Sequence, residues 1–515
     1  MPTPTYDVII IGSGFGGTFA AAGLVDRGLR VLMLERGRRV TRGPENWEPS
    51  AAAQLSEHYS EATPYHVTDD HGTGTTGGFF CLGGPSVFYG GVSLRYRERD
   101  FEPHADVTGD SGAQWPFGYG ELEPWYSRAE QMIGVAGRAG EDPTEPPRGA
   151  GYTAPPRPLA PISERLARAA SGLGYHPFRL PLAINFGTDG RNPCIECATC
   201  DGFPCAIEAK NDLATSVLPS LVGKGLEVRT GVAAIELTRD AGRVTRVVVT
   251  DAASGARETL SARHFVLAAG AIATPHLLLA SGIDEVSPAR DAVGGYLMRH
   301  CNRIIFGLFL KRPDPDGRHH KQIGIHDLYH QAGGLQQLVT PPVSLVRAQI
   351  PKIIGPVAAR LVPHITGFLA IAEDQPQRDN RMTLDRARRD ALGMPVATIT
   401  HHYSERDERA VATLASAGKR ILRSAGAVAF YRHRIWTFSH AIGTVRMGDD
   451  PRRAPLDARG RYRGLSNLTI TDASALPTSA SVNPSLTIAA TAYRAGTLLA
   501  GELSQTRHSA DISIA

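Results

Sequence analysis

A glycine-rich turn close to the N-terminus constrains the fold of this chain more than any other stretch. Residues Val8 to Ile11 form a continuous apolar run, and glycines follow at positions 12, 14 and 17. Such a run suits a strand buried on both faces of a parallel sheet. Gly12 permits the tight turn, Gly14 lets the backbone approach a pyrophosphate, and Gly17 lets the next helix pack on the strand. The stretch therefore predicts the start of a dinucleotide-binding β-α-β unit.

The second half of this unit follows in the expected order. The stretch TFAAAGLVDRG (18–28) predicts a helix that ends at a glycine, and RVLMLERG (30–37) predicts the second strand. Glu35 closes that strand 23 residues after Gly12, the spacing at which an acid binds ribose hydroxyls. A glycine-rich turn without a ligand is the alternative, but strand, helix and acid together argue against it. The motif alone does not separate FAD from NAD.

Length and charge limit the classes of protein that this chain fits. Its 515 residues are too many for one ordinary hydrophobic core, so we expect at least two domains. It carries 55 basic and 51 acidic residues, a net charge of +4. That excess is weak for this length, so we expect no nucleic-acid partner.

Neither a leader nor a membrane span is expected. The N-terminal residues MPTPTYDVIIIG lack the basic region and cleavage site of a signal peptide. The longest apolar region, 350–372, contains Lys352, Arg360, His364 and three prolines, unlike a spanning helix of about 20 apolar residues. We expect a buried or lid segment there, with a flap facing lipid or substrate as the alternative. We expect a cytoplasmic protein without a transmembrane segment.

A second glycine cluster, CLGGPSVFYGG, occupies residues 81–91. Gly83 and Gly84 can expose backbone N–H groups to a phosphate. Gly90 and Gly91 allow the backbone to approach a flat ring closely. An ordinary surface loop is the alternative, but four glycines among apolar residues favour a loop packed against a ligand.

The middle of the chain changes character near residue 290. Residues 225–283 predict three strands, a further buried strand and a helix, as in an α/β unit. Residues 290–440 instead combine a strand-like run at 303–310 with a helical pattern at 404–426. We interpret this region as most of a substrate domain inserted into the cofactor domain.

The order of these motifs resembles the glucose-methanol-choline (GMC) family of FAD-dependent oxidoreductases over nearly the whole chain. GGPSVFYGG (83–91) is similar to the first family signature, GAIATPHLLLASGI (270–283) to the second, and residues 467–490 to the closing segment. Pro85, Tyr89 and Asp284 depart from the residues usual there. FYGGVSLRYRERDFEP and LGYHPFRLPLAIN resemble the subgroup acting on sugars, which includes aminoglycoside 6′-alcohol dehydrogenases.

The resemblance implies an α/β fold, α+β overall: a Rossmann-like FAD-binding domain with an inserted substrate domain built on an antiparallel sheet. The FAD-binding domain would comprise 1–110, 190–290 and 440–515, and the substrate domain with lid segments 111–189 and 291–439. The ends of the chain would meet, with Asp472 and Ala473 near the ribityl-pyrophosphate and Val232 near the adenine. The expected FAD contacts are Gly12, Gly14, Gly17, Glu35, Gly83, Gly84, Tyr89, Gly90, Val232, Ala269, Asp472, Ala473, Asn483, Pro484 and Thr487.

The catalytic candidates lie near the C-terminus, in SHAIGTVRMGDDP (439–451) and SVNPSLTIAA (481–490). Oxidation of an alcohol needs a base for the hydroxyl proton, and a neutral imidazole suits that task. Asn483 offers a donor and an acceptor to the same oxygen. The family uses a His–His or His–Asn pair in these motifs, so the resemblance implies that His440 and Asn483 are catalytic. A structural histidine and a helix cap at Asn483 are the alternatives, and His401 and His402 are the next candidate bases.

The expected activity is FAD-dependent oxidation of a primary or secondary alcohol to an aldehyde or ketone, by hydride transfer to flavin N5. The expected substrate is a small molecule, with a sugar or amino-sugar hydroxyl favoured by the subgroup resemblance. O2 or an external acceptor would reoxidise the flavin. The competing hypotheses are a flavin-dependent hydroxynitrile lyase, oxidation of a lipophilic alcohol or sterol, and a flavin-binding sensor without turnover.

Four of the six cysteines, Cys194, Cys197, Cys200 and Cys205, form a C-x2-C-x2-C-x4-C cluster. This pattern is similar to ferredoxin spacing and to a zinc knot. The last spacing and the missing proline after the fourth cysteine depart from the ferredoxin pattern. We therefore expect thiols without a metal, in an intracellular protein.

Overall fold

The computed structural model describes residues 6–70, 72–187, 189–315, 321–349, 355–435 and 437–512. A parallel sheet of five strands has the order β18-β10-β1-β2-β6. Its strands are β1 (Tyr6–Ile11), β2 (Val31–Glu35), β6 (Glu227–Thr230), β10 (Ala262–Leu267) and β18 (Leu468–Ile470). Strands far apart in the sequence are therefore neighbours, which confirms the expected parallel α/β unit.

The glycine turn after β1 leads directly into helix α1 (Phe15–Leu24). Gly12 has φ +106°, which favours glycine, and a Cβ there would overlap the carbonyl oxygen of Ala268. A Cβ at Gly17 would likewise overlap the carbonyl oxygen of Gly12. Both glycines thus permit α1 to start immediately above β1 and β10, as the sequence motif predicts.

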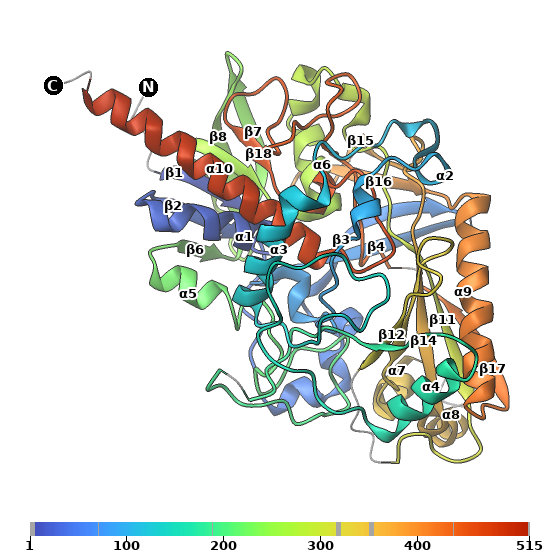
Figure 1. Cartoon of the computed structure of the whole chain (residues 1–515). Coiled ribbons are helices and arrows are strands. Elements are labelled where there is room, and N and C mark those ends of the chain that lie inside the picture. The colour runs from blue at the N-terminus through green and yellow to red at the C-terminus, as the bar shows by residue number, and fades with distance from the viewer. Residues whose placement is uncertain are drawn as a thin grey trace.

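The C-terminal helix α10 (Ser485–Ile512) packs along α1 beside the parallel sheet, as Figure 1 shows. The two helices touch through their backbones, because a Cβ at Gly23 would lie 2.6 Å from the carbonyl carbon of Gly496. Helix α3 (Tyr119–Ile133) packs on the same α10. The two ends of the chain therefore meet, as the family resemblance implied.

A second sheet of six strands is antiparallel and has the order β17-β11-β14-β13-β12-β5. Its strands are β5 (Phe178–Arg179), β11 (Cys301–Leu308), β12 (Ile323–Ile325), β13 (Gly334–Leu338), β14 (Ile365–Ala372) and β17 (Ala429–Arg434). Helix α9 (Glu405–Ser424) packs against β11 and β14, and helix α4 (Pro161–Ser171) packs on α9 (Figure 1). Ser404 and Asp407 cap α9 reciprocally, which explains why the helix begins there. This sheet confirms the antiparallel part of the predicted fold.

The apolar region 350–372 is divided between several elements. Helix α8 (Gly355–Leu361) comes first, and β14 then forms an interior strand whose residues from 366 to 372 are buried. Residues 350–354 lie outside the described part of the chain. The expectation of a buried segment holds for β14, since its apolar residues pack in the core rather than form a flap.

Two smaller sheets and four further α-helices complete the sheets and α-helices of the described residues, and short 3-10 helices connect many of them. One sheet, β15-β16-β3-β4, contains β3 (Tyr59–Asp69), β4 (Gly72–Phe79), β15 (Arg381–Arg389) and β16 (Pro395–His401). The other contains β7 (Val232–Asp240), β8 (Arg243–Asp251) and β9 (Arg257–Leu260). The helices are α2 (Ala105–Thr108), α5 (Leu218–Gly223), α6 (Gly270–Ala280) and α7 (Val343–Gln349). β3 pairs with β16, so this sheet joins segments from both predicted domains.

Among the described helices, none is both long and apolar enough to cross a membrane.

Candidate active site

The two glycine clusters lie directly against each other. The backbone N–H of Gly83 donates to Ser13 Oγ at 2.9 Å, and Ser13 Oγ donates to Glu35 Oε2 at 2.6 Å. A Cβ at Gly84 would lie 3.0 Å from Gly14 Cα, whereas a Cβ at Gly14 would meet no atom within 4 Å. The N-terminus of α1 therefore opens into free space with the second glycine loop at its side. The sequence motif did not single out Ser13, which links the two clusters.

Glu35 ends β2 and is buried among backbone donors. Its carboxylate accepts hydrogen bonds from the backbone N–H groups of Ser13 at 3.1 Å and Gly37 at 2.8 Å. Burial raises the pKa of Glu35, and these hydrogen bonds oppose that rise. The acid thus lies at the carboxyl end of the parallel sheet, beside the glycine turn, where open α/β sheets bind nucleotides.

The closing segment joins the same region through Asp472. Its Oδ2 accepts from the backbone N–H of Gly270 at 2.9 Å and from Thr274 Oγ1 at 2.5 Å. A Cβ at Gly16 would lie 2.8 Å from Asp472 Cα, so the closing segment touches the first turn of α1. Ala269 precedes α6, and Ala473 follows Asp472 in a short helical turn. Three segments widely separated in the sequence therefore converge at one end of the sheet.

The remaining expected cofactor residues stand in different settings. Tyr89 donates its hydroxyl to the carbonyl oxygen of Asn211 at 2.8 Å, and its ring lies 5.8 Å from that of Phe15. Val232 begins β7, which packs beside β2. Pro484 immediately precedes α10, and the Thr487 hydroxyl shares a 2.7 Å hydrogen bond with that of Tyr126. The hydroxyls of Tyr89 and Thr487 thus form hydrogen bonds with other protein atoms.

A buried ion pair beside the second glycine loop fits a phosphate-bearing cofactor. Arg42 Nη2 lies 2.9 Å from Asp212 Oδ2, with side chains 8% and 0% exposed. Among the described residues, Arg42 Nη1 and Asp212 Oδ1 are left without a hydrogen-bond partner. The neighbouring Leu213 N–H donates to Ser86 Oγ, so this segment packs on the loop at 83–87. A guanidinium with an unused donor, paired with a segment that packs on this loop, suits a diphosphate, and the residues present therefore fit FAD. Neither Arg42 nor Asp212 stands in a motif, so the sequence did not indicate them.

The structure brings together the two candidate catalytic residues. Asn483 Nδ2 lies 3.5 Å from His440 Nε2, and Asn483 Oδ1 accepts from Gln336 Nε2 at 2.7 Å. A third residue completes the group, because His300 Nδ1 lies 2.9 Å from His440 Nδ1. Helix α10 begins two residues after Asn483, and the Asn483 side chain is directed to Gln336 and His440. His300 was not expected from the sequence, since it stands 140 residues before His440.

The surroundings keep both imidazoles neutral. Burial lowers the pKa of His440 to about 3, and the neighbouring His300 and Lys321 act in the same direction. Burial also lowers the pKa of His300. His440 therefore holds a free lone pair throughout the neutral range, which a proton acceptor requires.

A charged pair lies close enough to His440 to affect its pKa. Lys321 Nζ is 2.8 Å from Asp201 Oδ2, and the lysine side chain is only 7% exposed. A Cβ at Gly90 would lie 3.0 Å from the carboxylate carbon of Asp201. The pair thus connects the second glycine cluster with the surroundings of His440. Asp201 lies within the cysteine-rich segment, a link that no sequence spacing indicated.

The two reserve candidates for the base lie elsewhere. His401 is buried, and its Nε2 lies 3.6 Å from Asp374 Oδ2. His402 is half exposed and pairs with Asp70 at 2.6 Å. Both side chains thus pair with a carboxylate, and Asp374 also accepts from the backbone N–H of His300. His440 is the histidine that lies beside Asn483.

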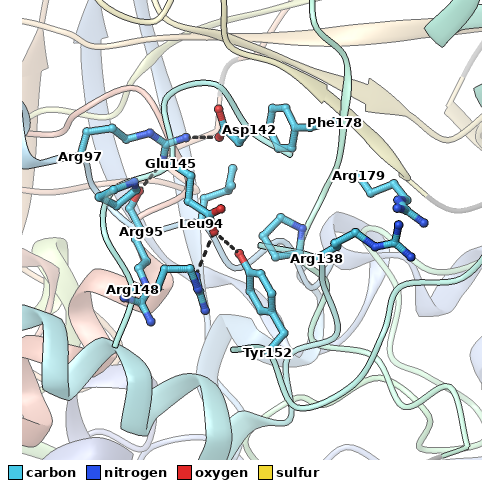
Figure 2. A pocket seen from close by; sticks show the side chains of 12 residues that line it. Leu94, Arg95, Arg97, Arg138, Asp142, Glu145, Arg148, Tyr152, Phe178 and Arg179 are labelled. Atoms are coloured by element: carbon cyan, nitrogen blue, oxygen red, sulfur yellow. Dashed lines mark hydrogen bonds and ion pairs between the residues drawn. The ribbon is translucent and has the colours of Figure 1, made fainter. Parts of the chain in front are cut away.

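An arginine-lined pocket near residues 94–97 and 138–152 is a separate feature (Figure 2). Arg97 pairs with Asp142, and Arg148 pairs with Glu145 at 3.2 Å. Unlike Arg42, the arginines of this pocket have no buried nitrogen without a hydrogen-bond partner among the described residues, so we assign no anionic ligand to it.

All six cysteines are free thiols, Cys194 being buried and Cys197, Cys200 and Cys205 partly exposed. Across the described ranges, no group of three or more His, Cys, Asp or Glu side chains is arranged to hold a metal ion.

Comparison with known proteins identifies relatives along the whole chain. Two family models described as GMC oxidoreductase match residues 74–302 and 376–492. Paromamine 6′-oxidase from Streptomyces fradiae is 32% identical over 98% of this chain and 93% of its own length. 6‴-Hydroxyparomomycin C oxidase from Streptomyces lividus is 33% identical, over 98% and 92%. The crystal structure of pyridoxine 4-oxidase from Mesorbium loti superposes with a TM-score of 0.66 at 20% identity, covering 96% of this chain and 99% of that one.

Proposed function

Since the chain belongs to the GMC oxidoreductase family and is an FAD-dependent enzyme that oxidises alcohols, we propose that it oxidises a sugar or amino-sugar hydroxyl with His440 as the base. The contact between His440 and Asn483 carries this proposal. His440 Nε2 takes the hydroxyl proton, and the Asn483 amide donates to the same oxygen and holds it beside the base. Bound FAD supplies the hydride acceptor at N5. The product is an aldehyde or a ketone.

The polar surroundings of His440 favour a hydroxyl-rich substrate. The Lys321–Asp201 pair and Gln336 offer charged and amide groups near the base. Such groups recognise hydroxyl and ammonium groups well, and they would lose hydrogen bonds to a sterol. The two relatives at 32% and 33% identity are named for paromamine and hydroxyparomomycin, both amino-sugar compounds.

A lipophilic substrate, a lyase reaction and a sensor role find less support. An apolar flap at 350–372 would favour a lipophilic alcohol, but the last eight residues of that region form the interior strand β14. The two relatives are named as oxidases, which does not favour a lyase or a sensor without turnover. We propose O2 or an external carrier as the electron acceptor that would reoxidise the bound cofactor.

The proposal also covers the residues that contact FAD and the boundaries between the two domains. We propose that FAD contacts the fifteen residues expected from the sequence, together with Arg42, and that the domains divide at the expected boundaries. The convergence of the two glycine clusters with Asp472 supports these contacts. We further propose a cytoplasmic location and four clustered thiols that hold no metal. Elemental analysis tests the last point, and stoichiometric iron with acid-labile sulfide would contradict it.

Anaerobic mixing with a panel of substrates tests the proposed function. The holoenzyme is mixed with neutral polyols, aldose sugars, aminoglycosides, long-chain alcohols and a sterol, and bleaching of the flavin absorption band is followed. We expect sugars or aminoglycosides to bleach the band. Bleaching by sterols or long-chain alcohols alone would contradict the proposed substrate class. Exposure of the reduced enzyme to air, and separately to a dye, then identifies the acceptor.

A further inference from the structure

The ring of His300 lies between two fixed partners. Its Nε2 lies 2.9 Å from the carbonyl oxygen of Ser479, and its Nδ1 lies 2.9 Å from His440 Nδ1. A carbonyl oxygen can only accept, so His300 Nε2 must carry a hydrogen and donate it. A neutral imidazole has one N–H group, which leaves the lone pair of His300 on Nδ1.

This lone pair determines where His440 carries its own proton. With His300 Nδ1 as the acceptor, the hydrogen bond between the two rings requires His440 Nδ1 to be the donor. The lone pair of His440 is then on Nε2, the nitrogen that lies beside Asn483. We propose that His300 fixes the tautomer of His440 in this way, so that the basic nitrogen faces the substrate hydroxyl. The proposal rests on the proposed role of His440 as the base and adds His300 as a positioning residue.

The backbone holds His300 in an uncommon conformation for this purpose. Its φ is +60°, a region that L-residues other than Asn, Asp and His seldom adopt. Its N–H donates to Asp374 Oδ1 at 3.0 Å, and its carbonyl oxygen accepts from the Tyr403 hydroxyl at 2.8 Å. Ser479 Oγ also donates to Asp374 Oδ1, at 2.9 Å.

The carboxylate of Asp374 thus anchors both His300 and Ser479. The carbonyl oxygen of Ser479 in turn accepts the hydrogen bond from His300 Nε2. The rings of His300 and His440 meet nearly at right angles, with centroids 5.0 Å apart and an interplanar angle of 89°. An edge-on contact of this kind directs one ring nitrogen at the other. Loss of His300 would let His440 exchange between tautomers, and the form protonated on Nε2 cannot accept a proton from the substrate.

Two variants of similar side-chain size separate this role from a structural one. His300→Asn keeps an acceptor near the position of Nδ1 and tolerates positive φ, whereas His300→Leu removes the acceptor. We expect His300→Leu to lower the rate of flavin reduction about 10- to 10²-fold, less than loss of the base itself, with little change in KM. His300→Asn should recover part of that rate. His402→Gln, at the half-exposed histidine paired with Asp70, serves as the control and should behave as wild type.

A double-variant cycle tests whether His300 acts through His440. If it does, adding His300→Leu to His440→Ala should cause no further loss of rate. NMR of ¹⁵N-histidine-labelled protein supplies a readout independent of turnover. The signal that disappears in His440→Ala should show the proton on Nδ1 in wild type and a tautomer mixture in His300→Leu.

Three results would overturn the inference. One is an unchanged reduction rate in His300→Leu, another is a further loss in the double variant, and the third is wild-type His440 protonated on Nε2. If His440 is not the base, a different result is expected: the His440→Ala variant alone would reduce its flavin at the normal rate. FAD content and thermal unfolding of each variant identify misfolded protein, and the NMR result on wild type stands even if His300→Leu fails to fold.

Discussion

In the mechanism that we propose, the chemistry at the residue scale depends on one imidazole and one amide. We predict that His440→Ala keeps its FAD, because the glycine loops, Arg42 and Asp472 lie on other segments. Its rate of flavin reduction should fall by about 10² to 10⁴-fold, the usual contribution of a general base. Asn483→Ala should also slow reduction, and Asn483→His should recover part of the rate. Rapid mixing under anaerobic conditions measures all three, and a normal rate with normal flavin content in His440→Ala would assign the base elsewhere.

The pKa of the base determines the pH dependence of the reaction. An ordinary imidazole, with a pKa near 6.5, would give a rate that rises with pH across the neutral range. Burial lowers the pKa of His440 to about 3, so the neutral, basic form predominates well below pH 6.5. We therefore predict that the rate of flavin reduction stays flat from about pH 8 down to about pH 5 and falls only as pH approaches the lowered pKa.

The same measurement on His440→Ala supplies the control for this pH profile. The acid limb should be absent from the variant, because its ionising group is gone. A wild-type limb centred near pH 6.5 that disappears in the variant would show that bound substrate and FAD return His440 to its ordinary pKa.

At the scale of elements, the close packing of α10 on α1 connects the C-terminal helix with the glycine turn at 12–17. A Cβ at Gly496 would overlap the backbone of Ala20, whereas a Cβ at Gly501 on the same helix would meet no atom within 4 Å. We predict that Gly496→Ala destabilises the protein by about 1–3 kcal/mol through overpacking and weakens FAD retention. Gly501→Ala should be neutral or stabilise by up to about 1 kcal/mol, since alanine favours a helix. Denaturant unfolding compares the stability of the two variants, and equal stability would contradict the close backbone contact between α1 and α10.

Local patterns in the sequence predicted the elements whose signals lie within a few residues. The β1–α1–β2 unit follows from apolar runs, glycine spacing and Glu35, and α9 follows from the helical pattern at 404–426. The pairing of β3 with β16 could not be predicted, because it joins residues more than 300 positions apart and no local pattern records a partner strand. β3 lies in the proposed FAD-binding domain and β16 in the proposed substrate domain, so this sheet connects the two.

Contacts between distant segments could not be predicted at the candidate active site either. His440 and Asn483 stand in short motifs and could be named, whereas His300, Arg42 and the Lys321–Asp201 pair stand in none. Their roles arise from contacts between distant segments, such as the 2.9 Å contact between His300 and His440. The apolar run at 350–372 illustrates the converse case, since composition alone could not distinguish a flap from the interior strand β14.

At the scale of the whole molecule, the proposed cofactor site is built from segments that lie far apart in the sequence. The turn at 12–17, the loop at 83–91 and the closing segment at 467–490 meet through Ser13, Gly83, Gly84, Gly16 and Asp472. A ligand bound among them stabilises only the state in which they are assembled, by an amount that grows with the logarithm of its concentration. FAD should therefore stabilise the entire fold rather than one unit of it.

We accordingly predict that removal of FAD lowers the unfolding temperature and that added FAD restores it. At a free concentration of about 100 times its dissociation constant, a ligand that binds only the folded state raises the free energy of unfolding by about 2.7 kcal/mol. Hydrogen exchange should show the three segments gaining protection together on FAD addition, because each completes the site for the others. Riboflavin, which lacks the diphosphate, is the matched control and should stabilise less, since Arg42 and the glycine backbone would have no phosphate to bind. Stabilisation by NAD but not by FAD would contradict the cofactor assignment, and protection confined to residues 12–17 would contradict the shared site.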